Sequence, residues 1–391
     1  MTIGEKLGDR GGLCEMSSQA ILGFALVAML LAPAVEWRFA EALPEKTARV
    51  GAHAYVGIYE FAAGELVVPD QYSTIQNAID EANPGDVVFV KEGVYVEHVV
   101  VNKTVSLIGE NNKTTIIDGN KTGPVVLIAA EGVNITGFTI RAGQNTHPIC
   151  DVWLENVSRC SVHGNVLESA FYGVYLNEAC GNSIFENSAT DGSIGVCGFH
   201  SHGNSISRNT FVANSFAGMN FHLCSFNNLT ENVIRDNSVG LRFLDGANNN
   251  TVYHNNFVDN TAQAFVQSSY NNSWDDGYPS GGNYWSNYGG FDVRSGPFQN
   301  VTGSDGLGDT RFVVDLNNID RYPLKKSWPC LFGDVNGDCK VDMRDVGFVA
   351  RRFMSWPGDP LWHAAADVIV DGWIDMKDIG NVAKRFGEHC L

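Results

Sequence analysis

A repeat of 22 or 23 residues in the middle of the chain constrains the fold more than any other feature. The phrases SVHGN, SIFEN, SISRN, NLTEN and TVYHN place an aliphatic residue at Val162, Ile184, Ile206, Leu229 and Val252. A second set of phrases keeps the same period and begins at Gly173, Gly195, Gly218 and Gly240. A period just above twenty residues with alternating apolar positions is typical of a β-solenoid, whose turns bury their apolar side chains only when they stack.

Two polar positions accompany each repeat. An asparagine lies three residues after each aliphatic residue, at Asn165, Asn187, Asn209, Asn232 and Asn255. We expect these side chains to bond to one another as a ladder at a bend of the solenoid, because amides stack well between adjacent strands. The residues before them, Glu186, Arg208, Glu231 and His254, predict an outward column of alternating charge. Cross-strand ion pairing explains such a column better than ligand binding does.

Both ends of the predicted solenoid carry closing segments. Ser73 and Gln76 are spaced as a capping box before a short helix with one apolar face, and this helix is expected to cover the first turn. Strands are expected from Val87 onward, with Val125–Ile140 as the first clear turn. An aromatic cluster is predicted to seal the other end: Trp274, Tyr278, Tyr284, Trp285, Tyr288 and Phe291.

These phrases resemble a known group. The capped opening, the NITGFTI turn and the segments GGNYWSNYGGFD, DGLGDTRFVVD and NNIDRYPL are similar to NosD-type proteins of the pectate-lyase-like superfamily, a group associated with periplasmic copper. The resemblance implies a mainly β protein with a right-handed parallel β-helix over residues 64–326. It leaves the activity open, because this fold carries many functions.

The predicted β-helix contains few candidates for catalytic or copper-binding residues. The motifs of polygalacturonase-type hydrolases and of pectin esterases are missing, with SHG at Ser201–Gly203 as the nearest echo, so no catalytic residue is assigned. Asp275 and Asp276 are adjacent acids, as a lyase would need for Ca²⁺, but they lie in the closing segment. A copper site would draw on soft and imidazole ligands. His200, His202 and His222 lie near each other in register, with Cys197 and Met219 close by in sequence.

The C-terminal tail contains the same phrase twice. VDMRDVGFVARRF begins at Val341 and IDMKDIGNVAKRF at Ile374, and eight of the thirteen positions are identical. A twelve-residue loop with oxygen ligands precedes each predicted helix, in the pattern by which such loops wrap Ca²⁺. The predicted calcium ligands are Asp334, Asn336, Asp338, Lys340 (backbone carbonyl), Asp342 and Asp345 in the first loop, and Asp367, Asp371, Trp373 (backbone carbonyl), Asp375 and Asp378 in the second.

Two such loop–helix units closely resemble a type I dockerin. The resemblance covers about residues 333 to 388 and implies a small calcium-binding domain, placed at residues 330–391, that docks to a cohesin-like domain of another protein. Ile369 replaces an oxygen ligand in the second loop, which predicts a weaker site there, and Cys339 replaces the glycine expected in the first. Cys330 and Cys390 flank the domain, so a disulfide between them, or one that uses Cys339, is conceivable.

Partner contacts in dockerins involve loop positions 10 and 11 and the helices, which assigns a docking face to this chain. Its residues are Met343, Arg344, Arg351 and Arg352 in the first unit and Met376, Lys377, Lys384 and Arg385 in the second. The repetition predicts an almost two-fold basic and apolar surface.

Composition and the N-terminus indicate an exported protein. Residues 1–42 are expected to be a signal peptide or an N-terminal anchor, because the apolar run Ala20–Val35 follows Lys6 and Arg10 and precedes the small-x-small pattern AEA. Nine cysteines are compatible with some disulfides outside the cell. Nine N-x-S/T sequons permit a glycoprotein: Asn102, Asn112, Asn120, Asn134, Asn156, Asn228, Asn249, Asn271 and Asn300. The net charge of −18 argues against nucleic acid.

Three functions follow from these patterns. The first is a secreted or cell-surface protein that binds carbohydrate or surface components and docks to a partner through a calcium-dependent module. Its β-helix is expected to be monomeric. The second is a polysaccharide-degrading lyase or glycoside hydrolase tethered by the same module. The third is copper binding of the NosD type.

Overall fold

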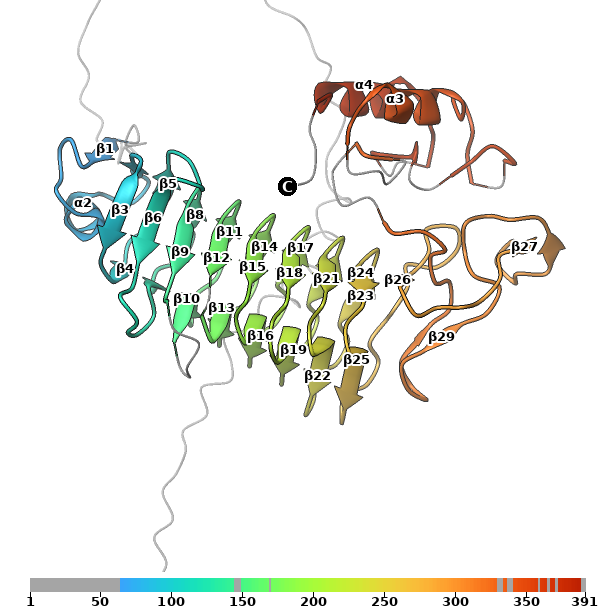
Figure 1. The fold of residues 1–391 in the computed structure, drawn as a ribbon, viewed down its shortest axis with the longest axis horizontal. Coiled ribbons are helices and arrows are strands. Elements are labelled where there is room, and N and C mark those ends of the chain that lie inside the picture. The colour runs from blue at the N-terminus through green and yellow to red at the C-terminus, as the bar shows by residue number, and fades with distance from the viewer. Residues whose placement is uncertain are drawn as a thin grey trace, which may run out of the picture. The chain divides into compact units, whose positions relative to one another are not determined.

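The computed structural model describes residues 64–143, 149–168, 170–328, 333–335, 340–357, 359–363, 366–369 and 372–387. Residues 1–42, with the expected leader, lie outside this part of the chain. Within it, the chain forms a parallel β-helix followed by a small module with two helices (Figure 1), which confirms the predicted mainly β class. None of the helices in the described ranges is long and apolar enough to cross a membrane.

Three parallel sheets form the β-helix, and each full turn of the chain adds one strand to each of them. Sheet A contains β1 (Glu65–Val68), β2 (Val87–Val90), β5 (Ser106–Gly109), β8 (Asn134–Thr136), β11 (Ser161–His163), β14 (Ser183–Phe185), β17 (Ser205–Ser207), β20 (Asn228–Thr230) and β23 (Thr251–Tyr253). Sheet B contains β3 (Gly93–Val96), β6 (Thr115–Asp118), β9 (Thr139–Arg141), β12 (Val166–Glu168), β15 (Ser188–Thr190), β18 (Thr210–Val212), β21 (Val233–Arg235), β24 (Asn256–Val258) and β26 (Tyr284–Trp285).

Sheet C has the longest strands. It contains β4 (Val99–Val101), β7 (Val126–Ile128), β10 (Cys150–Glu155), β13 (Tyr172–Asn177), β16 (Ile194–Phe199), β19 (Ala217–His222), β22 (Val239–Leu244) and β25 (Ala262–Gln267). Two antiparallel hairpins follow the helix: β27 (Arg294–Ser295) with β28 (Val301–Thr302), and β29 (Phe312–Val313) with β30 (Ile319–Asp320).

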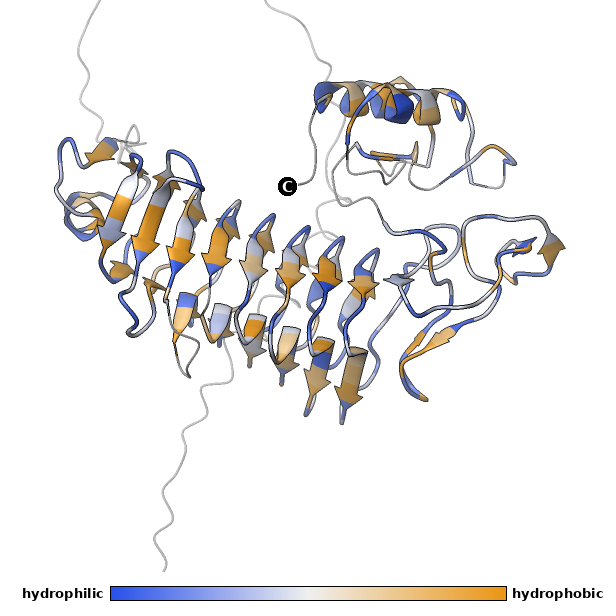
Figure 2. Ribbon diagram, in the orientation of Figure 1, coloured by the Kyte–Doolittle hydropathy of each residue, from blue (hydrophilic) through white to orange (hydrophobic). Residues whose placement is uncertain are grey.

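Residues one sequence repeat apart pair with each other on neighbouring strands of sheet A. Ile184 pairs with Val162 on one side and with Ile206 on the other, and all three side chains are buried in the core. Apolar residues are concentrated on the strands, which also carry polar residues, and hydrophilic residues are frequent at the bends between them (Figure 2). The helix begins earlier than expected, because β1 precedes Val87 and pairs with β2, which belongs to the next turn.

Asparagine ladders connect the turns. The Oδ1 atom of Asn209 accepts hydrogen bonds from the backbone N and from Nδ2 of Asn187, both at 3.0 Å, while its Nδ2 donates to the Ile184 carbonyl at 2.8 Å. This pattern confirms the predicted ladder, which continues to Asn283. Two further ladders were not predicted: Asn182, Asn204, Asn227, Asn250 and Asn272, and Asn214, Asn237 and Asn260. Buried amides therefore satisfy the backbone at three bends.

The repeated glycines mark a close approach of backbones in sheet C. A Cβ atom at Gly195 would lie 2.6 Å from the carbonyl oxygen of Gly218 and 2.5 Å from Cδ1 of Phe211. Gly218 meets the carbonyl oxygen of Gly240 in the same way, at 2.9 Å. The absence of a side chain at this position lets successive turns pack against each other.

Helix α2 (Ile75–Glu81) covers the first turn with Ile75, Ala78 and Ile79 buried, as predicted. Its N-cap is Thr74, whose side chain accepts a hydrogen bond from Asn77 N, so the capping box placed on Ser73 was wrong by one residue. The remaining N-terminal N–H groups are bound from outside the helix, because the Glu97 carboxylate accepts from Ile75 N and Gln76 N.

The last turn is closed by tryptophans. Trp285 stacks on Phe257 at 4.4 Å and on Phe312 at 4.1 Å, and both Trp285 and Trp274 are buried. Phe291 is 77% exposed, so its assignment to this seal was wrong. The Asp320 carboxylate accepts a hydrogen bond from Nε1 of Trp285 at 2.8 Å, and burial raises the pKa of Asp320 to about 7.

The C-terminal module, described between residues 333 and 387, has α3 (Met343–Ala350) and α4 (Met376–Lys384) packed on a small core. The core repeats the sequence duplication, since Val341 and Ile374 are both buried, as are Val349 and Val382.

The cysteines of the β-helix fall into two groups. Cys150, Cys160, Cys197 and Cys224 are buried and are not disulfide-bonded, whereas Cys180 is disulfide-bonded. The disulfide considered for the module involves Cys330, Cys339 and Cys390, which lie outside the described residues.

Candidate functional site

The first calcium loop leads into α3 through two aspartates. Asp342 is the N-cap of the helix and accepts a hydrogen bond from Arg344 N at 2.6 Å, while its own N–H donates to Oδ2 of Asp345 at 2.8 Å. This capping box fixes loop positions 9 and 12 relative to each other. Asp334, at position 1, and Asp345 are completely buried. Asn336 and Asp338 lie outside the described residues, and Lys340 is exposed.

The second loop repeats this arrangement. Asp375 caps α4, and its N–H donates to Oδ2 of Asp378 at 2.8 Å. The Oδ1 atom of Asp378 accepts from Ile369 N at 3.0 Å, and Oδ2 of Asp367 accepts from Gly372 N at 2.9 Å. Trp373 is exposed, and Asp371 lies outside the described residues.

The donor set of both loops fits calcium. Four predicted ligands are buried aspartates, namely Asp334, Asp345, Asp367 and Asp378. Carboxylates are costly to remove from water unless charge or hydrogen bonds compensate, and oxygen atoms are the ligands that Ca²⁺ prefers. Among the residues that the structure describes, no three His, Cys, Asp or Glu side chains are arranged to hold a metal ion. Three of the predicted ligands, Asn336, Asp338 and Asp371, lie outside the described residues.

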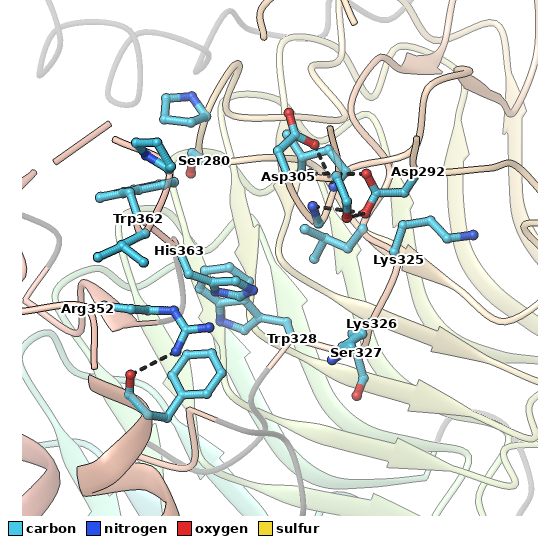
Figure 3. Close-up of a pocket in the computed structure, with 18 of the residues that line it drawn as sticks. Ser280, Asp292, Asp305, Lys325, Lys326, Ser327, Trp328, Arg352, Trp362 and His363 are labelled. Carbon is cyan, nitrogen blue, oxygen red and sulfur yellow. Dashed lines mark hydrogen bonds between the residues drawn. The ribbon is translucent and has the colours of Figure 1, made fainter. Parts of the chain in front are cut away.

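The predicted docking face is exposed on both helices, with one exception. Met343 and Met376 are 67% and 65% exposed, and Arg344, Arg351, Lys377, Lys384 and Arg385 are exposed as well. Arg352 is the exception, because its guanidinium lies 3.6 Å from the ring centroid of Phe348 and donates from Nη1 to the Phe348 carbonyl at 2.9 Å (Figure 3). Burial lowers the pKa of Arg352.

A second candidate site lies on the outer face of sheet C. Strand register aligns one outward residue from each of six successive turns: Trp153, Tyr175, Cys197, Asn220, Arg242 and Phe265. The rings of Trp153 and Tyr175 meet edge to face at 5.1 Å. The Arg242 guanidinium lies 4.3 Å from the Phe216 ring centroid and donates to Oδ1 of Asn220 at 3.3 Å.

Polar groups border this column. Glu155 accepts hydrogen bonds from Nε1 of Trp153 at 2.6 Å and from Nδ2 of Asn177 at 2.9 Å. Aromatic rings with polar neighbours present an apolar surface and hydrogen-bonding groups together, which suits a ring-shaped polar ligand. This face was not predicted from the sequence. The phrases that begin at Gly173 and its equivalents contained the signal, since the residue two positions after each glycine is one member of the column.

The column of alternating charge is a structural feature. Arg208 bonds to Glu186 at 3.0 Å and lies 3.6 Å from Glu231, as the ion-pairing interpretation predicted. His254 does not join the column, because its ring is buried and stacks on Trp328 at 3.4 Å. Burial lowers the pKa of His254 to about 4.

The copper candidates do not come together. Met219 lies in the core of the helix, whereas Cys197 belongs to the outer column of sheet C. Ser225 N donates to Nδ1 of His202 at 3.0 Å, and Nε2 of His222 bonds to Asp245 at 2.9 Å. These residues therefore do not fit a copper centre.

The acids considered for catalysis have structural partners. Asp275 is buried and pairs with Arg321 at 2.6 Å, so it does not form an acidic pair with the exposed Asp276. In the closing segment, Asp292 accepts hydrogen bonds from Asp305 N and Gly306 N (Figure 3). Ser201 is buried at a bend.

The family model described as periplasmic copper-binding protein (NosD) matches residues 76–290, which is more than half of the chain. The chain belongs to the NosD family. Residues 332–387 of this NosD protein match the model of the type I dockerin domain, in agreement with the sequence resemblance.

One curated relative is similar in sequence to part of this chain. A cell surface glycoprotein of Methanothermus fervidus is 32% identical over 103 residues, which cover 26% of this chain and 16% of the relative. The chain thus spans a small fraction of the length of that protein.

Solved structures with similar folds are distant from this NosD protein. Pectate lyase Pel9A is 12% identical with a TM-score of 0.38, and the match covers 58% of this chain and 75% of the lyase. An alginate lyase from Paenibacillus sp. is 16% identical with a TM-score of 0.31, covering 54% of this chain and 94% of the lyase. The protein ORF18 of Geobacillus virus E2 is 13% identical with a TM-score of 0.33, covering 51% of this chain and 56% of that chain. Scores at this level support no statement about activity.

Proposed function

We propose that this chain is an exported surface protein whose dockerin domain binds calcium and docks to a cohesin-like domain of a partner, while its β-helix binds carbohydrate. One observation carries the docking part: both loop–helix units bury their first and last aspartates beside a capping box. Type I dockerin domains in general bind calcium and cohesin partners, which supports the assignment. The periplasmic family description and the surface glycoprotein relative support export.

Calorimetric titration of the full chain with Ca²⁺ tests the metal part. We expect one tight and one weaker binding event, because Ile369 removes an oxygen ligand from the second loop. Asp334→Ala is expected to abolish the tight event, since the first loop loses a buried carboxylate. Asp276→Ala removes an exposed acid of the closing segment and serves as the control, which should bind like the wild type.

The same preparation tests docking against a panel of type I cohesin domains. Binding of at least one cohesin in Ca²⁺, with release by a chelator, is the expected result. A chain that binds no cohesin, or binds one equally well in chelator, would contradict the proposed function.

The carbohydrate part is supported by the outer face of sheet C. We expect the full chain to bind a soluble polysaccharide in affinity electrophoresis, and Trp153→Ala to weaken that binding about tenfold, because aromatic anchors dominate such surfaces. Tyr270 is 54% exposed and lies outside the column, so Tyr270→Ala is the matched control. Equal binding by both variants and the wild type would place the ligand elsewhere.

A further inference from the structure

The fold exposes the nine N-x-S/T sequons to different degrees. Six of the sequon asparagines are exposed: Asn102, Asn120, Asn156, Asn249, Asn271 and Asn300. The other three, Asn112, Asn134 and Asn228, are half-buried. Nδ2 of Asn112 donates to the Gly164 carbonyl at 3.1 Å. Oδ1 of Asn134 bonds to Nε2 of His163 at 3.1 Å, and Oδ1 of Asn228 is buried.

Four of the exposed sequons lie on one bend of the β-helix, where the chain passes from sheet C to sheet A. Asn102 follows β4, Asn156 follows β10 and Asn249 follows β22, and each of them precedes the next strand of sheet A. Asn271 follows β25 and precedes Ser273, which extends sheet A by one bridge. Groups attached to these asparagines would therefore line a single edge of the β-helix.

The bend turns through a residue with a left-handed backbone. In five successive turns this place is taken by Gly181, Gly203, Phe226, Asn249 and Asn271, whose φ angles are 67°, 65°, 61°, 56° and 58°. Glycine and asparagine are the residues that adopt this conformation most readily. The fold thus permits an asparagine here for reasons of backbone geometry alone.

The residues after the left-handed place complete the sequon. The next residue in each turn is a buried ladder asparagine, and a serine or threonine follows it in four of the five turns: Ser183, Ser205, Thr251 and Ser273. Because the ladder holds Asn250 inside, with Nδ2 donating to the Cys224 carbonyl at 3.0 Å, the side chain of Asn249 before it lies at the surface. The repeat becomes an exposed sequon whenever asparagine occupies the left-handed place.

A second left-handed place precedes the first on the same bend. Asn156 has a φ of 49° there and is followed by Val157, which is 5% exposed. The next residue is Ser158, whereas equivalent positions of later turns carry Cys180 and His202. Bend geometry favours an asparagine at position 156 but requires no hydroxyl two residues later. The sequon at Asn156 is therefore not a by-product of the repeat.

We infer that the bend between sheets C and A is N-glycosylated in the exported chain, at Asn102, at Asn156 and at one of the pair Asn249 and Asn271. This inference rests on the export that belongs to the proposed function. The pair counts as one site because its members occupy the same place in neighbouring turns, about 4.8 Å apart. A sugar chain on one of them leaves no room for a second on the other.

The modification transfers a sugar chain from a donor outside this protein. The donor is an oligosaccharide bound through its anomeric carbon to a lipid phosphate, and a membrane transferase of the exporting cell catalyses the step. A bond forms between the asparagine Nδ2 and the anomeric carbon while the bond from that carbon to the phosphate oxygen breaks. The lipid phosphate leaves with the electron pair, and the amide nitrogen releases one proton.

Site mapping of the full chain tests the inference. The chain is produced in a cell that exports and N-glycosylates proteins, and the sugars are released by a glycosidase in heavy-oxygen water, which marks each modified asparagine for mass spectrometry. Marks are expected at Asn102, at Asn156 and within the pair. The half-buried acceptors are the matched controls and should stay unmarked: Asn112, Asn134 and Asn228.

Intact mass of the variants gives a second readout. Asn156→Gln is expected to lose the mass of one sugar chain, whereas Asn134→Gln should keep the wild-type mass. Asn249→Gln and Asn271→Gln should each keep it as well, because the remaining member of the pair takes the sugar chain. Only the variant with both substitutions is expected to lose it.

A gain of modification tests the role of the bend directly. Gly203 is exposed, and a Cβ atom there would meet no atom within 4 Å. Gly203→Asn completes a sequon with Asn204 and Ser205, so we expect one additional sugar chain. Gly203→Asp fits the same left-handed backbone without an acceptor amide and is the control. Adding Ser205→Ala to Gly203→Asn should abolish the gain.

Each outcome has a distinct meaning. An exported chain without marks on this bend, or a Gly203→Asn variant without added mass, would overturn the inference and leave export and docking intact. Marks at Asn112, Asn134 or Asn228 in place of the exposed asparagines would overturn it as well. A chain that stays inside the cell would contradict the proposed export, and the inference would fall with it.

Discussion

At the scale of single residues, buried asparagines do most to fix the geometry of the β-helix. Each ladder amide accepts and donates several hydrogen bonds at a bend, where the backbone would otherwise keep unsatisfied groups. The asparagine side chain also has a suitable length, because its amide reaches the equivalent asparagine of the next turn. A serine hydroxyl has a single donor hydrogen and could not make the same set of contacts.

Removal of one ladder amide tests this role. Asn209→Ala leaves the backbone N of Asn187 and the Ile184 carbonyl without their side-chain partners, so we expect a loss of about 2 kcal/mol or more in the free energy of unfolding. Denaturant unfolding of the β-helix measures the loss. Asn102→Ala changes an exposed asparagine outside the ladders and should alter stability by no more than about 0.5 kcal/mol.

At the scale of secondary-structure elements, the glycines of sheet C set the spacing between turns. Strands β13, β16, β19 and β22 each carry a glycine at the point where the neighbouring backbone approaches. The long strands of this sheet depend on that approach, and the outer column of aromatic and polar residues depends on those strands.

A single added methyl group tests the close approach. Gly195→Ala is expected to destabilise the β-helix by about 1–3 kcal/mol, because the new Cβ overlaps the Gly218 carbonyl oxygen and the Phe211 ring. Gly289→Ala has open space around the added atom and is the matched control, which should unfold like the wild type. Equal stability of the two variants would show that the turns can shift apart at no cost.

Some of these elements could be predicted from the sequence and others could not. The period of Val162 and its equivalents predicted the turns of sheet A, since strand register and sequence period are the same quantity in a solenoid. The turns before Val125 were less visible, because they contain no repeated asparagine to mark the bend. Two ladders were missed although Asn182 and Asn214 and their equivalents keep the same period of 22 or 23 residues.

The candidate sites also differ in how far the sequence predicts them. Calcium ligands were predicted from loop spacing, which is local in the sequence. The outer column of sheet C joins residues that are 22 or 23 positions apart and differ in type, so the repeated glycine phrases mark four of its members but do not show that these side chains form one surface. The contact of Arg352 with the Phe348 ring also required coordinates, because the sequence shows only that Phe348 stands where the second unit has Asn381.

At the scale of the whole molecule, the β-helix and the module have cores of very different size. The core of the helix runs through every turn, whereas the module core contains Val341, Val349, Ile374 and Val382 with few other buried residues. A domain with so small a core usually needs a metal or another link to remain folded.

Calorimetry of the full chain can resolve the two parts. We expect two unfolding transitions in Ca²⁺, of which a chelator lowers only the one that belongs to the module, because metal stabilises the form that binds it. The Asp334→Ala variant should reproduce the effect of the chelator on that transition. A chelator that leaves both transitions unchanged would show that the module is folded without metal.

The register between turns also determines how such a molecule can change its length over evolution. Ser205 and Asn228 occupy equivalent places in adjacent turns, so loss of residues 205–227 would join Asn204 to Asn228 where Asn227 had been. Every amide would then meet a partner from the next remaining turn. Gene duplication or deletion in whole turns can therefore lengthen or shorten the β-helix while its capping helix and the C-terminal module are inherited intact.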